Sequence, residues 1–147
     1  MMDSSFVGRS FPPAEPYMVG VEKVREFADA IGERSPLCHD RTAARAAGHP
    51  DLVAPPTFAM AVVARAQEAV LFDPRLGLDF SRVVHGDQAF THHRPICAGD
   101  ELTAVVHIDA IREMAGNDII TLRTELTAHD DVPVCTAVST LVSRGAA

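Results

Sequence analysis

The sequence predicts an α+β fold in which a curled antiparallel sheet wraps around one long central helix. The central helix is expected over 57–72, between Pro55-Pro56 and Asp73-Pro74, and its first half, 57–64, contains no charged residue. A helix that is apolar on all sides must be enclosed by other elements. The second half of the chain instead alternates β-branched with polar residues, as antiparallel strands do. A sheet curled around the helix is the simplest arrangement that buries both.

Length and composition indicate a single domain over residues 1–147. The chain has 147 residues, 47% of them hydrophobic, which is enough for one core, and it contains no linker or internal repeat. The net charge of −7, without any run of Lys or Arg, argues against nucleic acid or an anionic membrane as the partner. Neither a membrane span nor the apolar block of a signal peptide is visible. We therefore expect a soluble, cytoplasmic protein.

Two shorter helices are expected before the central one. The first covers 21–31, where five apolar residues share one stripe and Gly32 follows in the position of a C-cap. The second covers 41–47, with Asp40 in the position of an N-cap and Gly48 at its end. The apolar stripe of the first helix consists of Val21, Val24, Phe27, Ala28 and Ile31.

Strands are expected mainly in the second half of the chain. Turn residues at 116–118 and at 130–133 separate the last three strands, which makes these strands antiparallel neighbours. Gly86 is expected to mark a bulge and Gly99 a turn between strands. The expected strands are 17–19, 83–92, 102–110, 120–126 and 134–142.

Several stretches of the sequence resemble the MaoC-like hot-dog hydratases and dehydratases. The most specific is 94–102, where Arg94-Pro95 is followed by Gly99-Asp100 and Leu102, similar to a pattern that precedes a long strand in that family. The resemblance covers nearly the whole chain and implies a hot-dog fold. Within the family, the chain is similar to the N-terminal-type dehydratase domain and to the non-catalytic subunits of two-subunit (3R)-hydroxyacyl-ACP dehydratases. The other similar stretches are 21–36, 52–58 and 114–119.

The first catalytic motif of the family is altered in this chain. Active members carry Gly-Asp-x-Asn-Pro-x-His after the first helix, where the Asp and His hold and deprotonate a water molecule. The matching residues here are 32–38, so Glu33 stands for the Asp and Cys38 for the His. A thiol with a pKa of about 8.5 is a poor base at neutral pH. His39 is the nearest imidazole, but in an extended backbone it would face away from Cys38.

The second catalytic motif is altered more severely. Active members carry His-Gly at the start of the central helix, where the Gly amide donates to the thioester oxygen as it gains enolate charge. Pro55-Pro56 stands in its place, and proline has no N–H to donate. The hydroxyl or amide of Thr57, at a helix N-terminus that favours negative charge, is the only substitute nearby. The prolines also have a purely structural explanation, because proline favours the start of a helix.

The resemblance therefore implies a subunit of a (3R)-hydroxyacyl-thioester dehydratase or enoyl hydratase of fatty acid metabolism, one that shapes the acyl-binding tunnel. The substrate would be an acyl-CoA or acyl-ACP thioester. The partner would be a hot-dog subunit with the intact motif, or a second copy in a dimer or larger assembly. Two alternatives stay open: a self-sufficient homodimeric hydratase that uses Glu33 with His39, and a non-enzymatic acyl-thioester-binding protein. The candidate tunnel residues are Pro56, Thr57, Phe58, Met60, Ala61 and Val62.

No metal or organic cofactor is expected. The three cysteines, at 38, 97 and 135, are odd in number and form no Cys-x-x-Cys, so they suggest neither a disulfide framework nor a zinc site. His92 and His93 would point to opposite faces of a strand, and His85 lies at no motif spacing from them. Arg82 and Arg94 are better explained as surface residues than as contacts to the phosphates of coenzyme A.

Overall fold

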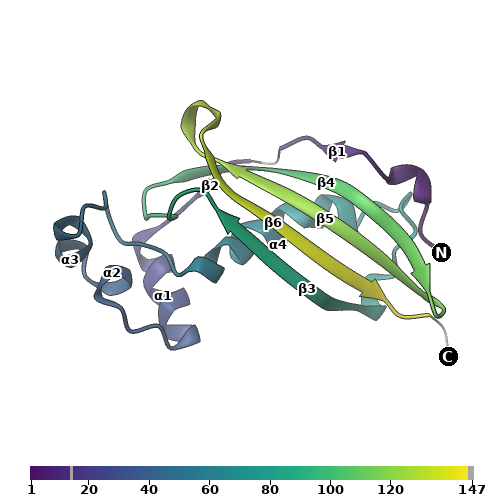
Figure 1. Ribbon diagram of the computed structural model, residues 1–147, viewed down its shortest axis with the longest axis horizontal. Helices are drawn as coiled ribbons and strands as arrows, with labels where there is room; N and C mark the ends of the chain where they lie inside the picture. The colour runs from purple at the N-terminus through teal and green to yellow at the C-terminus, as the bar shows by residue number, and fades with distance from the viewer. Residues whose placement is uncertain (14, 146–147) are drawn as a thin grey trace.

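The computed structural model describes residues 1–13 and 15–145, whose arrangement is shown in Figure 1. The α-helices in this part of the chain are α1 (Val21–Ile31), α2 (Pro36–His39), α3 (Arg41–Ala46) and α4 (Ala59–Leu71). The strands are β1 (Ser10–Phe11), β2 (Tyr17–Met18), β3 (Val83–His92), β4 (Glu101–Met114), β5 (Asn117–Thr127) and β6 (Pro133–Ser143). Single 3-10 turns cover Ser4–Phe6, Pro56–Phe58, Phe80–Arg82 and His129–Asp131.

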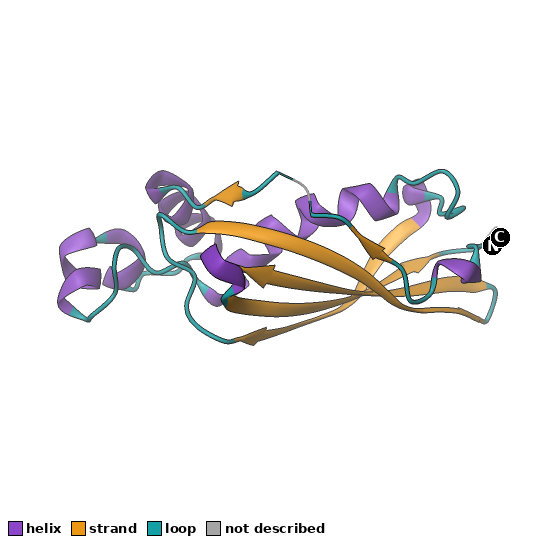
Figure 2. Ribbon diagram, turned by 90° about the horizontal axis from the view of Figure 1, so that it is seen from above, coloured by secondary structure: helices purple, strands orange, loops and turns teal. Residues whose placement is uncertain are grey.

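The strands form one antiparallel sheet that curls around α4 (Figures 1 and 2). Their order is β1-β4-β5-β6-β3, and β2 also pairs with β4. Within the described residues β3 pairs only with β6, so its whole length forms an edge of the sheet. The α+β fold with a curled antiparallel sheet around a long helix, which the sequence predicts, is confirmed.

The turn between β4 and β5 lies one residue earlier than expected. Both residues of the two-residue turn have left-handed backbones, with φ of 52° at Ala115 and 77° at Gly116. Asn117 pairs with Met114 and Asp118 with Glu113. The expectation of a turn over 116–118 was therefore wrong at 117 and 118, which belong to β5. A two-residue turn with positive φ matches the right-handed twist of the strands, and this lets both strands continue to their tips.

Gly86 and Gly99 have the structural roles that the sequence predicts for them. The register between β3 and β6 shifts between His85 and Asp87, so Gly86 lies in a bulge. A Cβ atom on Gly86 would lie 3.3 Å from the carbonyl oxygen of Thr140, which favours glycine at this close approach. Gly99 has a φ of 93° in the turn before β4. Both expectations are confirmed.

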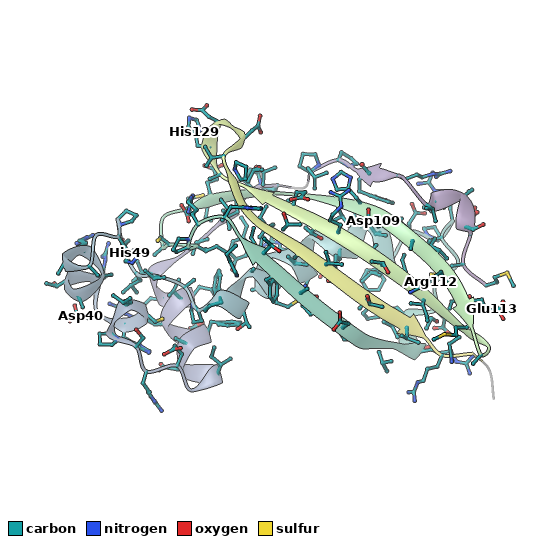
Figure 3. The ribbon with its side chains drawn as sticks, in the orientation of Figure 1. Asp40, His49, Asp109, Arg112, Glu113 and His129 are labelled. Atoms are coloured by element: carbon teal, nitrogen blue, oxygen red, sulfur yellow. The ribbon has the colours of Figure 1, made fainter. Side chains whose placement is uncertain are left out.

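The helices α1 to α3 lie together beyond one end of the sheet (Figure 1). Gly32, with a φ of 73°, ends α1 as a C-cap, and the side chain of Asp40 accepts from two amides at the start of α3. Asp40 lies at this end of the molecule in Figure 3. The apolar stripe of α1 is buried at Val24 and Ala28, but Ile31 is 51% exposed. Ile31 shares the apolar stripe, but it lies at the last turn of α1, where the helix extends beyond the core.

The central helix α4 is enclosed on one side only. Its buried residues face the sheet, while Ala64 and Arg65 are exposed. The expectation that its apolar first half is enclosed on all sides was therefore wrong for a single chain. An uncovered apolar flank is a surface that a second element or molecule can cover. The buried residues of α4 are Ala59, Val62, Val63, Gln67, Val70 and Leu71.

The core consists of two apolar clusters along α4. The first surrounds the start of the helix and includes Phe58 and Val63, and the second surrounds its end and includes Val70 and Leu122. None of the helices in the described part of the chain has the length and apolar character that a bilayer span needs.

Candidate functional site

The start of the central helix lacks the amide that the family places there. Pro56 opens the 3-10 turn Pro56–Phe58, and the amide of Phe58 donates to the carbonyl oxygen of Pro55 at 2.8 Å. Because Pro55 and Pro56 have no N–H, the first free donor on this side of the turn is Thr57. Pro56 and Thr57 are exposed, so the start of the helix faces outward.

The altered motif after α1 forms a helical turn rather than an extended segment. The hydroxyl oxygen of Ser35 accepts from the amide of Leu37 at 3.3 Å, and Pro36 occupies the first turn of α2. The condition under which His39 would face away from Cys38, an extended backbone, is not met, because both residues lie in α2. A serine cap followed by proline favours the start of a helix, and this pair explains the helical turn.

Cys38 cannot act as a base at neutral pH. Its side chain is buried, and this burial, reinforced by the negative charge of Glu33, raises the pKa of its thiol. A thiol with a raised pKa stays protonated near pH 7 and accepts no proton from water.

Glu33 and His39 lie close together but serve the local backbone. The carboxylate of Glu33 accepts from the amide of Ser35 at 2.8 Å. Nε2 of His39 lies 2.8 Å from the carbonyl oxygen of Glu33. Because a carbonyl only accepts, Nε2 carries the proton and Nδ1 is the basic nitrogen. The structure thus brings Glu33, Cys38 and His39 to one turn, with the carboxylate holding that turn instead of orienting the imidazole.

The six candidate tunnel residues fall into three groups. Pro56 and Thr57 are exposed, and Met60 and Ala61 are half-buried on α4. Phe58, by contrast, is fully buried, with its ring edge-on to Phe27 at 5.4 Å and to Tyr17 at 6.3 Å. Val62 is also buried in the core. In the single chain, Phe58 and Val62 are therefore part of the core beneath the helix and do not line an accessible surface.

A mostly apolar cavity of about 440 Å³ lies beside Pro55 and Pro56. Residues 53–56 line one side of it and residues 92–96 the other. Nε2 of His92 donates to the carbonyl oxygen of Pro56 at 2.9 Å, which ties the end of β3 to the start of the helix. This contact of His92 could not be predicted from the sequence, because no local signal indicates contact with a residue 36 positions away.

His93 points to the other face of the sheet. Its Nε2 lies 3.1 Å from the hydroxyl oxygen of Thr136 on β6, whereas His92 faces the helix. The expectation that these two imidazoles lie on opposite faces is confirmed. They therefore cannot bind one metal ion together.

The Arg94 to Asp100 segment is held by a paired charge. The guanidinium of Arg94 donates two hydrogen bonds to the carboxylate of Asp100, at 2.9 and 3.0 Å. The same carboxylate accepts from the amide of Cys97 at 2.8 Å. This bidentate pair closes the loop before β4 and explains why the pattern contains both residues. Arg94 is already neutralised, which argues against a role in binding phosphate.

The three cysteine thiols are expected to resist alkylation in the folded protein at about pH 8 and to react fully in urea. Burial is the main cause that raises the pKa of Cys38 and of Cys97, and it raises the pKa of Cys135 to about 11. Unfolded thiols ionise near pH 8.5. The contribution of the neutral buried thiols to the free energy of unfolding is therefore fully present below about pH 8.5. It is lost as the pH rises towards 11.

Labelling with iodoacetamide and urea midpoints at neutral and alkaline pH test this prediction. Rapid labelling of native protein, or a midpoint that rises with alkaline pH, would contradict it. The variant Cys135→Ala removes the largest of these shifts and is expected to flatten the alkaline loss of stability.

Comparison with known proteins places the chain in a family. Residues 5–137 match the model of the FAS1-like dehydratase domain region. Two similar proteins are the UPF0336 proteins of Saccharopolyspora erythraea, 59% identical over 99% of this chain and 94% of that protein, and of Streptomyces coelicolor, 52% identical over 99% and 97%.

Solved structures agree with this placement. The HadBC (3R)-hydroxyacyl-ACP dehydratase complex of Mycobacterium tuberculosis is 32% identical, with a TM-score of 0.84 over 93% of this chain and 96% of the matched chain. A MaoC-like dehydratase is 33% identical, with a TM-score of 0.88 over 97% of this chain, which spans 43% of that longer protein. With its curled sheet, central helix and 5–137 match, the chain belongs to the FAS1-like dehydratase-region family of hot-dog dehydratases.

Proposed function

We propose that the chain is a subunit of a (3R)-hydroxyacyl-thioester dehydratase or enoyl hydratase, in which it shapes the acyl tunnel and a partner subunit supplies the chemistry. One observation carries this proposal: Pro55 and Pro56 occupy the turn before α4, and neither has an amide that could donate to the developing enolate oxygen. Family membership supports the hydratase or dehydratase reaction. The experiments below test whether the catalytic groups come from the partner subunit.

The altered turn after α1 supports the same division. A water molecule that is added to an enoyl thioester must lose a proton to a nearby base. Cys38 is buried and protonated, and the carboxylate of Glu33 is bound to the amide of Ser35. A chain with these residues has lost both the base and its orienting group from the usual positions. The missing groups would come from the partner.

The open edge of the sheet offers the surface for a partner. β3 leaves ten residues, Val83–His92, unpaired on one side in the described chain, and the apolar flank of α4 lies exposed at Ala64. A long unpaired edge is a template for pairing with another strand. A hot-dog partner that extends the sheet across β3 would cover both features. HadBC, which the chain resembles, is a (3R)-hydroxyacyl-ACP dehydratase complex.

The substrate in this proposal is an acyl thioester carried by coenzyme A or an acyl carrier protein. Pro56, Thr57, Met60 and Ala61 would line the acyl tunnel, because they are accessible at the start and on the surface of α4. Phe58 and Val62 would hold that part of the helix in place. The apolar cavity beside His92 would lie at the thioester end of the path.

Co-expression with a hot-dog protein that carries the intact motif tests the assembly. We expect a stable complex that co-purifies through size-exclusion chromatography. Phe90, on the inner face of the edge strand, packs against the core cluster, so Phe90→Lys places an inward-pointing charge at the edge and should abolish co-purification. Thr91→Lys, on the outer face of the same strand, is the matched control and should leave the complex intact. Failure to form a complex, together with turnover by the chain alone, would refute the proposal.

One contact favours a second candidate, a homodimeric hydratase that uses Glu33 with His39. The hydrogen bond from Nε2 of His39 to the carbonyl oxygen of Glu33 leaves Nδ1 without a hydrogen-bond partner among the described residues. Only two copies of this chain, and no other subunit, would then be needed. A third outcome, binding of an acyl thioester without any reaction, would identify the chain as a binding protein.

A further inference from the structure

A layer of buried polar side chains separates the two halves of the core. Gln67 on α4, Thr124 on β5 and Ser139 on β6 are at most 2% exposed. Nε2 of Gln67 donates to the hydroxyl oxygen of Ser139 at 3.0 Å and reaches that of Thr124 at 3.5 Å. Burying polar groups costs free energy unless they are paired, so these hydrogen bonds offset most of the cost of burying the layer.

The hydrogen bonds of this layer run from the helix to the open edge of the sheet. The hydroxyl of Ser139 donates to Oε1 of Gln88 on β3 at 2.5 Å. Nε2 of His85 donates to the same oxygen at 3.1 Å. The chain of donors therefore passes from Gln67 through Ser139 to Gln88, which lies on the strand that has no second neighbour in the described residues.

The polar layer falls between the two apolar clusters on both β5 and β6. On β6 it falls between Ala137 of the first cluster and Leu141 of the second. On β5 it falls between Leu126 and Leu122 in the same way. Gln88 pairs directly with Ser139, whereas Thr124 pairs with Ala137, so the layer runs straight from β3 to β6 and then steps diagonally to β5.

An apolar stretch of defined length separates this layer from the start of α4. His92, bound to the carbonyl oxygen of Pro56, marks the start, and Gln88 lies four residues away along β3, about 13 Å in a strand. Along the helix, Thr57 and Gln67 are ten residues apart, or roughly 15 Å. Between the two ends the inner face of β3 carries Phe90, which packs against the first cluster.

We propose that the layer formed by Gln67 and Gln88 sets the length of the acyl chain that this subunit accepts. The proposal rests on the proposed function, because it assumes that the acyl chain enters beside Pro56 and runs between α4 and β3. An extended alkyl chain, with C–C bonds of about 1.5 Å in a zigzag, fills 13 to 15 Å with roughly ten to twelve carbons. Longer chains would have to pass the amides of the layer.

Two features make the layer a barrier to methylene groups. Oε1 of Gln67 makes no hydrogen bond with the other described residues and keeps only a small exposed area, since Gln67 as a whole is 2% exposed. A methylene group placed against it would remove its access to water without replacing the hydrogen bond. Gln88, only half-buried at the edge, would lose water in the same way.

The test measures how the affinity for acyl-pantetheine thioether analogues depends on chain length, with the chain as purified and any partner that accompanies it. We expect the affinity to increase from octanoyl to dodecanoyl and to decrease at hexadecanoyl. Gln88→Leu should improve binding of hexadecanoyl relative to dodecanoyl by about tenfold, equivalent to about 1.4 kcal/mol. Thr91→Val, on the outer face of the same strand, should leave the ratio unchanged.

A second variant on another element keeps the test decisive if the first variant misfolds. Gln67→Leu removes the donor of the layer from the helix side and should shift the same ratio in the same direction, while circular dichroism reports whether the protein is folded. An unchanged ratio in both folded variants would overturn the length limit and leave the proposed function standing. Absence of binding at every length would refute both. A shift in the Thr91→Val control would also count against the layer as the cause.

Discussion

Purified without a partner, the chain is expected to hydrate crotonyl-coenzyme A at least about a thousandfold more slowly than its complex with a hot-dog subunit that carries the intact motif. An oxyanion donor alone contributes roughly a hundredfold to a thousandfold, and a positioned base roughly a hundredfold to ten-thousandfold. This chain lacks the amide at Pro56 and has a protonated thiol at Cys38. The two losses are not additive, but each alone makes an isolated subunit slow.

The measurement compares initial rates of the chain, of the partner and of their complex at equal concentrations. Glu33→Gln and His39→Ala, introduced into this chain within the complex, should change the rate by no more than about twofold, since neither residue contacts the substrate in this proposal. A tenfold loss in both variants would identify Glu33 and His39 as the catalytic pair. The homodimeric hydratase would then be the better description.

Replacing Phe58 by alanine is expected to lower the free energy of unfolding by about 3 to 5 kcal/mol. The ring is fully buried in the first core cluster, and it meets the rings of Phe27 and Tyr17 edge-on. Its removal leaves a cavity between α1 and the start of α4 that the surrounding helices and sheet can fill only in part. Urea denaturation followed by circular dichroism measures the change.

Phe72→Ala provides the control for this prediction. Phe72 is 59% exposed and contacts one ring, that of Phe80 at 4.8 Å, so its loss should cost no more than about 1.5 kcal/mol. Equal costs at the two positions would contradict the packing assigned to Phe58. If Phe58→Ala instead kept full stability and weakened acyl binding, the side chain would belong to the tunnel and not to its support.

The sequence predicted most of the fold because the relevant signals are local. Gly32 and Asp40 mark helix ends through contacts within a few residues, and the alternation along β5 and β6 follows from the two-residue period of a strand. Where local signals competed, the prediction failed. The helical turn that begins at Ser35-Pro36 was not expected from the sequence.

The sequence by itself determined that this chain folds as a curled sheet around a helix and that Pro55 and Pro56 remove the amide donors, since a proline lacks its N–H in any fold. Only the tertiary structure decided that His92 meets Pro56, and that Gln67, Ser139 and Gln88 join in one polar layer. These partners are 36, 72 and 51 residues apart, and curling of the sheet is what brings them together. No periodicity along a chain records such distances, because contacts of that separation depend on how whole elements pack.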